Sequence, residues 1–123
     1  MSRTIWILDD QHSVHVLFDQ LLGTIKVDEE LVTRYFFSGD DLKRAILSEK
    51  PDILLVDVRL QNGSGIDFLN SLKELVNLEE IEIYMLSNSI NPDDIKYAWG
   101  TNVIKDYIPK PITRSDIQEI VFN

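Results

Sequence analysis

The chain alternates between short apolar runs and segments whose apolar residues recur every three or four positions. The runs at residues 4–8, 53–56 and 82–86 are nearly all apolar, which is typical of strands buried on both faces of a parallel sheet. The segment 33–37 mixes polar and apolar residues and predicts an edge strand, and a short fifth strand is predicted within residues 103–108. This alternation indicates successive βαβ units.

Five segments predict helices, because each carries one apolar stripe at helical spacing. The stripes are formed by Val14, Leu17, Phe18, Leu21 and Leu22; by Leu42, Ala45 and Ile46; by Ile66, Leu69, Leu72 and Val76; by Ile95, Ala98 and Trp99; and by Ile117, Ile120 and Val121. Ser38, Asn91-Pro92 and Thr113 suit helix N-termini, whereas Gly23 and Lys50-Pro51 suit helix ends. We therefore predict an α/β fold with a doubly wound parallel sheet and five helices.

The composition is typical of one cytoplasmic domain. Of the 123 residues, 44% are hydrophobic, which is enough for an ordinary core, and we expect a single domain over residues 1–123 with no effector domain. The chain has no cysteine, and its N-terminus lacks the order of a signal peptide. Its apolar runs are far shorter than the roughly 20 residues that a membrane helix needs. A net charge of −9 argues against direct nucleic-acid binding.

Polar side chains stand at the carboxyl ends of four predicted strands. Asp9 and Asp10 follow the first strand, Asp57 the third, Ser87 the fourth and Lys110 the fifth. Ligands of doubly wound sheets bind beyond this edge, so we expect the five side chains to converge there. Each alone has a structural explanation, since acids suit a helix N-terminus and a serine or lysine suits a turn. Their conjunction indicates a site for a divalent cation and a phosphoryl group.

The acidic residues predict a magnesium site. Neighbouring carboxylates repel unless a cation intervenes, and Mg²⁺ takes one or two carboxylates while it keeps several waters. We expect Asp10 and Asp57 to bind the ion directly, Asp9 to act through water, and the backbone carbonyl of Arg59 to supply a further oxygen; Mn²⁺ could substitute. A carboxylate can also attack a phosphoryl group, and the ion and the Lys110 ammonium would then stabilise the transition state.

The same residues resemble a known set. The combination of Asp9-Asp10, Asp57 with Gly65, Ser87, Tyr107 and Lys110-Pro111 is similar to that of response-regulator receiver domains of two-component signalling, of the stand-alone, chemotaxis-receiver-like kind. The resemblance covers essentially residues 1–123. It implies a flavodoxin-like sheet of strand order 2-1-3-4-5 and a bacterial signalling module, which is not an enzyme beyond catalysing its own phosphorylation and dephosphorylation.

The resemblance implies roles for these residues. Asp57 would accept a phosphoryl group from a sensor histidine kinase or a histidine phosphotransfer protein, and Lys110 and Ser87 would contact that group. Tyr107 would be the switch aromatic, whose ring turns inward as the Ser87 hydroxyl moves toward the phosphate. The peptide before Pro111 would be cis. The fourth helix, fifth strand and fifth helix would form the face for a downstream protein partner or a phosphorylation-dependent dimer, bearing Lys96, Tyr97, Lys105 and Tyr107.

Four features depart from the usual receiver pattern. Leu60 and Gln61 stand where the family has Met-Pro, and Asn88 replaces a small residue. Arg59 occupies a position that tunes the lifetime of the phosphate in the family, and the segment 100–107 is longer than in the chemotaxis receiver. We expect these departures to alter rates and to leave the chemistry intact.

Other functions stay open on the sequence alone. A phosphatase of the haloacid-dehalogenase type also uses an aspartate nucleophile and magnesium, but it needs a second acid where Arg59 stands. An FMN carrier needs a Ser/Thr/Gly-rich phosphate loop in place of the segment 9–11. A phosphate-independent scaffold would keep the acidic site without using it. His12 and His15 lie three apart on the first helix, and we interpret them as solvated residues because no third metal ligand is evident.

Overall fold

A five-stranded parallel sheet forms the centre of the computed structural model, which describes residues 2–60, 63–88 and 103–122. The strand order is β2-β1-β3-β6-β7, which is the predicted order 2-1-3-4-5 when the parallel strands are counted along the chain. The predicted fold class is therefore confirmed. The strands are β1 (Ser2–Leu8), β2 (Glu30–Phe36), β3 (Ile53–Asp57), β6 (Glu82–Ser87) and β7 (Ile104–Pro109).

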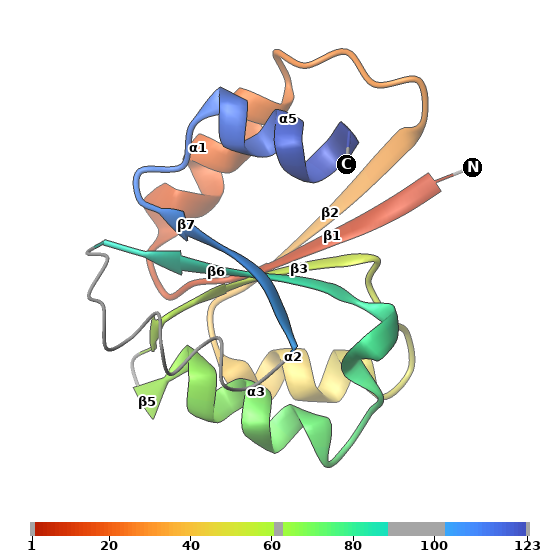
Figure 1. Cartoon of the computed structure of the whole chain (residues 1–123), viewed down its shortest axis with the longest axis vertical. Helices are drawn as coiled ribbons and strands as arrows, with labels where there is room; N and C mark the ends of the chain where they lie inside the picture. Colours follow the sequence, from red (N-terminus) through yellow and green to blue (C-terminus); the bar gives the residue numbers. More distant parts are fainter. Residues whose placement is uncertain (1, 61–62, 89–102, 123) are drawn as a thin grey trace.

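Helices cover both faces of this sheet (Figure 1). Helices α1 (His12–Leu22) and α5 (Arg114–Phe122) lie on one face, and α2 (Gly39–Ile46) and α3 (Gly65–Lys73) lie on the other. A short 3₁₀ helix, η1 (Leu78–Glu80), precedes β6. The predicted fourth helix, with Ile95, Ala98 and Trp99, lies outside the described residues.

Successive residues of the central strands enter two separate cores. In β1, Trp6 and Leu8 pack in the core under α2 and α3, whereas Ile5 and Ile7 pack in the core under α1 and α5. The same alternation holds in β3 and β6, because side chains of a strand point to opposite faces in turn. The apolar runs are continuous for this reason, as both faces of the sheet are covered.

Two helix N-termini form as the sequence predicts. The Ser38 hydroxyl accepts a hydrogen bond from the Asp41 backbone N–H at 3.3 Å, which satisfies a donor of the first turn of α2. Before α5, the Thr113 hydroxyl accepts from the Asp116 N–H at 3.1 Å, while the Asp116 carboxylate accepts from the Thr113 N–H at 2.9 Å. This reciprocal pair stabilises the start of α5.

Element lengths differ from the prediction where tertiary pairing decides them. Strand β2 begins at Glu30, earlier than predicted, because its residues pair in register with β1 from Ser2 onward. Phe37 lies beyond the end of this strand and is 46% exposed. Helix α2 ends at Ile46, before the predicted stop at Lys50-Pro51.

A small hairpin, which the sequence did not predict, follows the end of β3. Strands β4 (Arg59–Leu60) and β5 (Gly63–Ser64) pair antiparallel, and Gly63 has a φ of 141°, a conformation that favours glycine. The Gly65 N–H then donates to the Val58 carbonyl at 2.7 Å. Two-residue strands are too short to leave a periodic signal.

Among the described residues, none of the helices has the length and apolarity needed to cross a bilayer.

Candidate functional site

The carboxyl ends of the parallel strands meet at one edge of the sheet. Asp9 directly follows β1, Asp57 and Ser87 are the last residues of β3 and β6, and Lys110 directly follows β7. Backbone hydrogen bonds hold these ends together: the Lys110 N–H donates to the Ser87 carbonyl at 2.6 Å, and the Val58 N–H donates to the Leu86 carbonyl at 2.8 Å. The sheet thus brings the predicted residues to one place.

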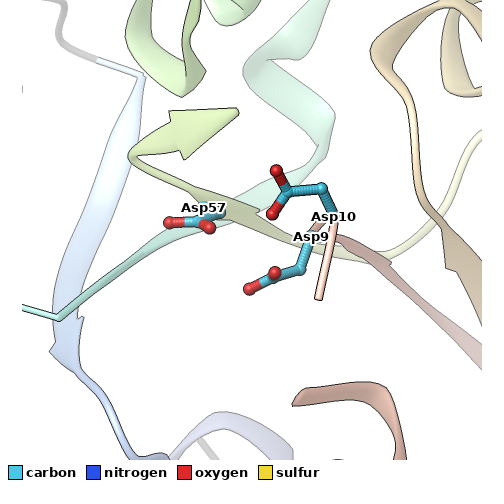
Figure 2. A group of neighbouring side chains, drawn as sticks. All are labelled: Asp9, Asp10 and Asp57. Carbon is cyan, nitrogen blue, oxygen red and sulfur yellow. The ribbon is translucent and has the colours of Figure 1, made fainter. Parts of the chain in front are cut away.

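Three carboxylates gather at this edge (Figure 2). Asp9 and Asp10 come from the end of β1 and Asp57 from the end of β3, and one oxygen of each lies within 4.8 Å of the others. Asp9 is fully buried and Asp57 is only 6% exposed, whereas Asp10 is exposed. The group is therefore anchored in the core and open to solvent at one point.

Lys110 brings a positive charge to the same group. Its Nζ lies 2.6 Å from Asp9 Oδ2 and 3.0 Å from Asp57 Oδ2, and the side chains of the three residues are almost entirely buried. Burial disfavours the charged ammonium, but the two carboxylates outweigh that cost and raise the pKa of Lys110 above its ordinary value. The lysine therefore stays protonated, and it neutralises only part of the acidic charge.

The Asp57 carboxylate is held from both sides. Its Oδ1 accepts a hydrogen bond from the Arg59 N–H at 3.2 Å, and its Oδ2 accepts one from Lys110. Burial raises the pKa of the Asp57 carboxyl, and the charge of Asp9 raises it further, while the bonds from Arg59 and Lys110 oppose this. The net direction is upward, so the folded protein holds the ionised form of Asp57 at a cost.

The donor set fits a hard divalent cation. Three carboxylates face one ammonium, which leaves an excess of negative charge among oxygen ligands, the kind that Mg²⁺ prefers. Both Asp9 oxygens already have partners, since Oδ1 accepts from the Gln11 N–H at 2.8 Å and Oδ2 meets Lys110. Both Asp57 oxygens have partners as well, so the exposed Asp10 is the best placed of the three for direct contact.

The predicted switch residues lie on the adjoining strands β6 and β7. Ser87 is buried at the end of β6, and the next residue, Asn88, is exposed. Tyr107 is half-buried on β7 and packs against the core under α2 and α3; its hydroxyl is buried and has no hydrogen-bond partner among the described residues. The Lys110–Pro111 peptide is cis, as the resemblance implied. Gln61, Lys96 and Tyr97 lie outside the described residues.

The interpretation of His15 as a solvated residue was wrong. His12 is exposed, but His15 is only 3% exposed and its Nε2 lies 2.7 Å from the Asp9 backbone carbonyl. The residue contacts the acidic group through the main chain. A signal was present, because His15 lies three and seven residues before Phe18 and Leu22 and so extends the apolar stripe of α1.

Sequence reasoning also missed why a glycine stands at position 65. A Cβ there would lie 2.0 Å from the Asp57 carbonyl oxygen, which no real Cβ contact tolerates. The glycine lets the start of α3 approach the backbone of the acidic residue. Only the resemblance had singled out this position.

Comparisons with known proteins agree with this fold. A model of the response regulator receiver domain matches residues 5–122. The DNA-binding transcriptional regulator NtrC of Proteus hauseri is 28% identical over 115 residues, which are 94% of this chain and 22% of that protein. The chain thus spans less than a quarter of the length of this curated relative.

Two solved structures show the same fold. The CheY-like receiver domain from Methylobacillus flagellatus has a TM-score of 0.81 at 21% identity, and the match covers 99% of this chain and 98% of that one. The phosphorylated cyanobacterial phytochrome response regulator RcpA has a TM-score of 0.74 at 27% identity, covering 98% and 89%.

Proposed function

The chain belongs to the family of response regulator receiver domains, and from this premise we propose that Asp57 accepts a phosphoryl group in a two-component phosphorelay. The observation that carries the proposal is the position of Asp57: a nearly buried carboxylate between Lys110 and two further acids at the open edge of the sheet. The phosphorylated form of RcpA, a similar protein, supports it.

The chemistry follows from the carboxylate. One Asp57 oxygen attacks the phosphorus of a phosphohistidine on a sensor kinase or a phosphotransfer protein, and the phosphorus–nitrogen bond breaks with its electron pair on the imidazole. The product is an acyl phosphate on Asp57. The Lys110 ammonium, 3.0 Å from Asp57 Oδ2, lies where it can offset charge on the transferred group.

Asp10 and Asp57 would hold a Mg²⁺ ion, with Asp9 acting through water and the Arg59 carbonyl as a further ligand. When bound, the ion offsets negative charge on the phosphoryl oxygens. Without it, ionised Asp57 stands beside Asp9, and the two carboxylates share a single ammonium.

The phosphoryl group would act through Ser87 and Tyr107. Ser87 ends the strand next to Asp57, since Asp57 pairs with Leu86 in the sheet, and Tyr107 pairs with Met85 on the adjoining strand. A hydroxyl that shifts toward the phosphate would leave room for the tyrosine ring. The face that includes β7 and α5 would then bind a downstream protein or a second copy of the chain; the predicted fourth helix, also assigned to this face, lies outside the described residues.

Intact mass spectrometry after incubation with acetyl phosphate and Mg²⁺ tests the proposal. Wild type should gain one phosphoryl group, and the gain should be lost in Asp57→Asn and in wild type with EDTA. Asp67→Asn is a matched control, because Asp67 is an exposed carboxylate in the first turn of α3 and should leave labelling unchanged.

Three results would contradict the proposal. Equal labelling of wild type and Asp57→Asn would place the phosphoryl group elsewhere. A folded wild-type protein that takes up none would favour a phosphate-independent scaffold. Steady release of phosphate over many turnovers would favour the aspartate-nucleophile phosphatase, for which Arg59 stands in the place of the second acid.

A further inference from the structure

His15 is a buried polar residue of α1 that directly contacts the backbone beside the acidic group. The side chain is 3% exposed, and Nε2 lies 2.7 Å from the Asp9 carbonyl oxygen. A carbonyl oxygen can only accept a hydrogen bond, so Nε2 must carry the proton and donate it. The bond therefore fixes which ring nitrogen is the donor.

Aromatic side chains surround the rest of the ring. Tyr35 meets it edge-on with ring centroids 5.0 Å apart, and Phe37 does so at 4.6 Å. The Tyr35 hydroxyl donates to Asp19 of α1 at 3.0 Å, which holds that wall in place. Nδ1 is buried and has no hydrogen-bond partner among the described residues. An apolar residue would fill this space without an unpaired nitrogen, so the histidine is best explained by the bond that it makes.

That bond acts on the peptide unit that leads to Asp10. The Asp9 carbonyl belongs to the peptide unit that joins Asp9 to Asp10, so a donor on this oxygen sets the plane of the peptide. Three further contacts hold Asp9 itself: its N–H donates to the Phe36 carbonyl at 3.1 Å, its Oδ1 accepts from the Gln11 N–H, and its Oδ2 pairs with Lys110. None of them acts on the Asp9–Asp10 peptide. The Asp10 side chain has no hydrogen bond or ion pair of its own within the described residues.

We propose that His15 is a positioning residue for the cation site, which holds the Asp9–Asp10 peptide so that the Asp10 carboxylate stays beside Asp57. The inference rests on the proposed function in that it takes these carboxylates as the Mg²⁺ ligands. Loss of an outer partner of a metal ligand typically weakens metal binding by about 10- to 100-fold. We expect the lower end, about tenfold, because His15 acts through the main chain and the other bonds to Asp9 remain.

Titration calorimetry with Mg²⁺ on three variants tests the inference. His15→Leu removes the donor and keeps the apolar contacts, and it should weaken Mg²⁺ binding about tenfold. His15→Gln keeps an N–H donor the same number of bonds from the backbone, and it should restore affinity to within about threefold of wild type. His12→Leu changes the exposed histidine of the same helix and should leave affinity unchanged.

The outcomes separate this inference from the proposed function. If wild type binds Mg²⁺ no better than His15→Leu, the inference alone is overturned. The inference is also overturned if His15→Gln has the melting temperature of wild type but binds Mg²⁺ as weakly as His15→Leu. Wild type that binds no Mg²⁺ overturns both. If His15→Leu does not fold, ¹⁵N NMR of the wild-type imidazole still decides: a proton on Nε2 of His15 supports the inference, and a bare Nε2 overturns it.

Discussion

Replacement of Gly65 by alanine should damage both the fold and the acidic site. The new Cβ would lie 2.0 Å from the Asp57 carbonyl oxygen, 3.0 Å from the Asp57 carbonyl carbon and 2.9 Å from Val56 Cγ1. Real Cβ contacts begin near 3.0 Å, so the Asp57 carbonyl and the start of α3 must separate by at least 1 Å. The neighbour is backbone in the centre of the sheet, which cannot move as a flexible side chain does.

The free-energy cost can be built from three contributions. Overpacking in a rigid core costs about 1–3 kcal/mol. Weakening of the 2.7 Å bond from the Gly65 N–H to the Val58 carbonyl adds about 1 kcal/mol, and the lower backbone entropy of alanine in the unfolded chain returns about 0.5–1 kcal/mol. The net destabilisation is roughly 1–3.5 kcal/mol, which lowers the Tm of a domain of this size by about 4–14 °C at roughly 4 °C per kcal/mol.

Thermal melts followed by circular dichroism would measure this loss. Gly23→Ala is the matched control: Gly23 has a φ of −63°, and a Cβ there would meet its nearest atoms at an ordinary 3.5 Å. That variant should melt at or slightly above the wild-type temperature. Labelling of Gly65→Ala by acetyl phosphate below its Tm should also be slower, by up to about 100-fold, because the nucleophile has moved. A Gly65→Ala protein that melts within about 2 °C of wild type would refute the steric reasoning.

Two further predictions concern charge at the site. Because burial raises the pKa of Asp57, the folded state binds more protons than the unfolded state between the ordinary and the raised value, and stability falls as pH rises through that window. In EDTA at pH 7, Asp57→Asn should therefore have a higher Tm than wild type, and this difference should disappear below about pH 4; a lower Tm would contradict the assigned cause. Lys110→Met leaves Asp9 and Asp57 without their cation and should lower the free energy of unfolding by roughly 3–5 kcal/mol in EDTA, a loss partly recovered with Mg²⁺. Because the pKa of Lys110 is raised, the lysine contributes its full stabilisation below about pH 10.5, and this stabilisation is lost as the pH rises through the raised pKa. A difference in unfolding free energy between wild type and Lys110→Met that changes between about pH 7 and 9 would count against this.

Much of the fold could be read from the periodicity of the chain. Runs such as Ile53–Val56 are apolar without interruption because α-helices cover both faces of the sheet, and this pattern alone indicated central parallel strands. The polar residues that stop these runs then marked the functional edge. Periodicity did not reveal the start of β2, which depends on its pairing with β1, or the β4–β5 hairpin, whose strands have two residues each.

His15 shows where sequence reasoning stops. His15 lies three residues before Phe18 and seven before Leu22 and so extends the stripe of α1, but a residue at this margin is buried only if another element covers it. Here Tyr35, near the end of β2, and Phe37, just beyond it, pack against the ring, although they lie twenty or more residues away in sequence. Burial of a residue at the margin of a stripe depends on neighbours that local spacing cannot specify.

The sequence by itself determined which residues stand at the carboxyl ends of the strands, because the hydrophobic pattern of a buried parallel sheet ends where they begin. Only the tertiary structure decided how these residues interact. Lys110 contacts both Asp9 and Asp57, and Arg59 and Lys110 each donate a hydrogen bond to one oxygen of Asp57. Burial raises the pKa of the Asp57 carboxyl. The physical reason is that desolvation and electrostatic pairing act through space over a few ångströms. They depend on which strands become neighbours and on how far the chain buries each charge.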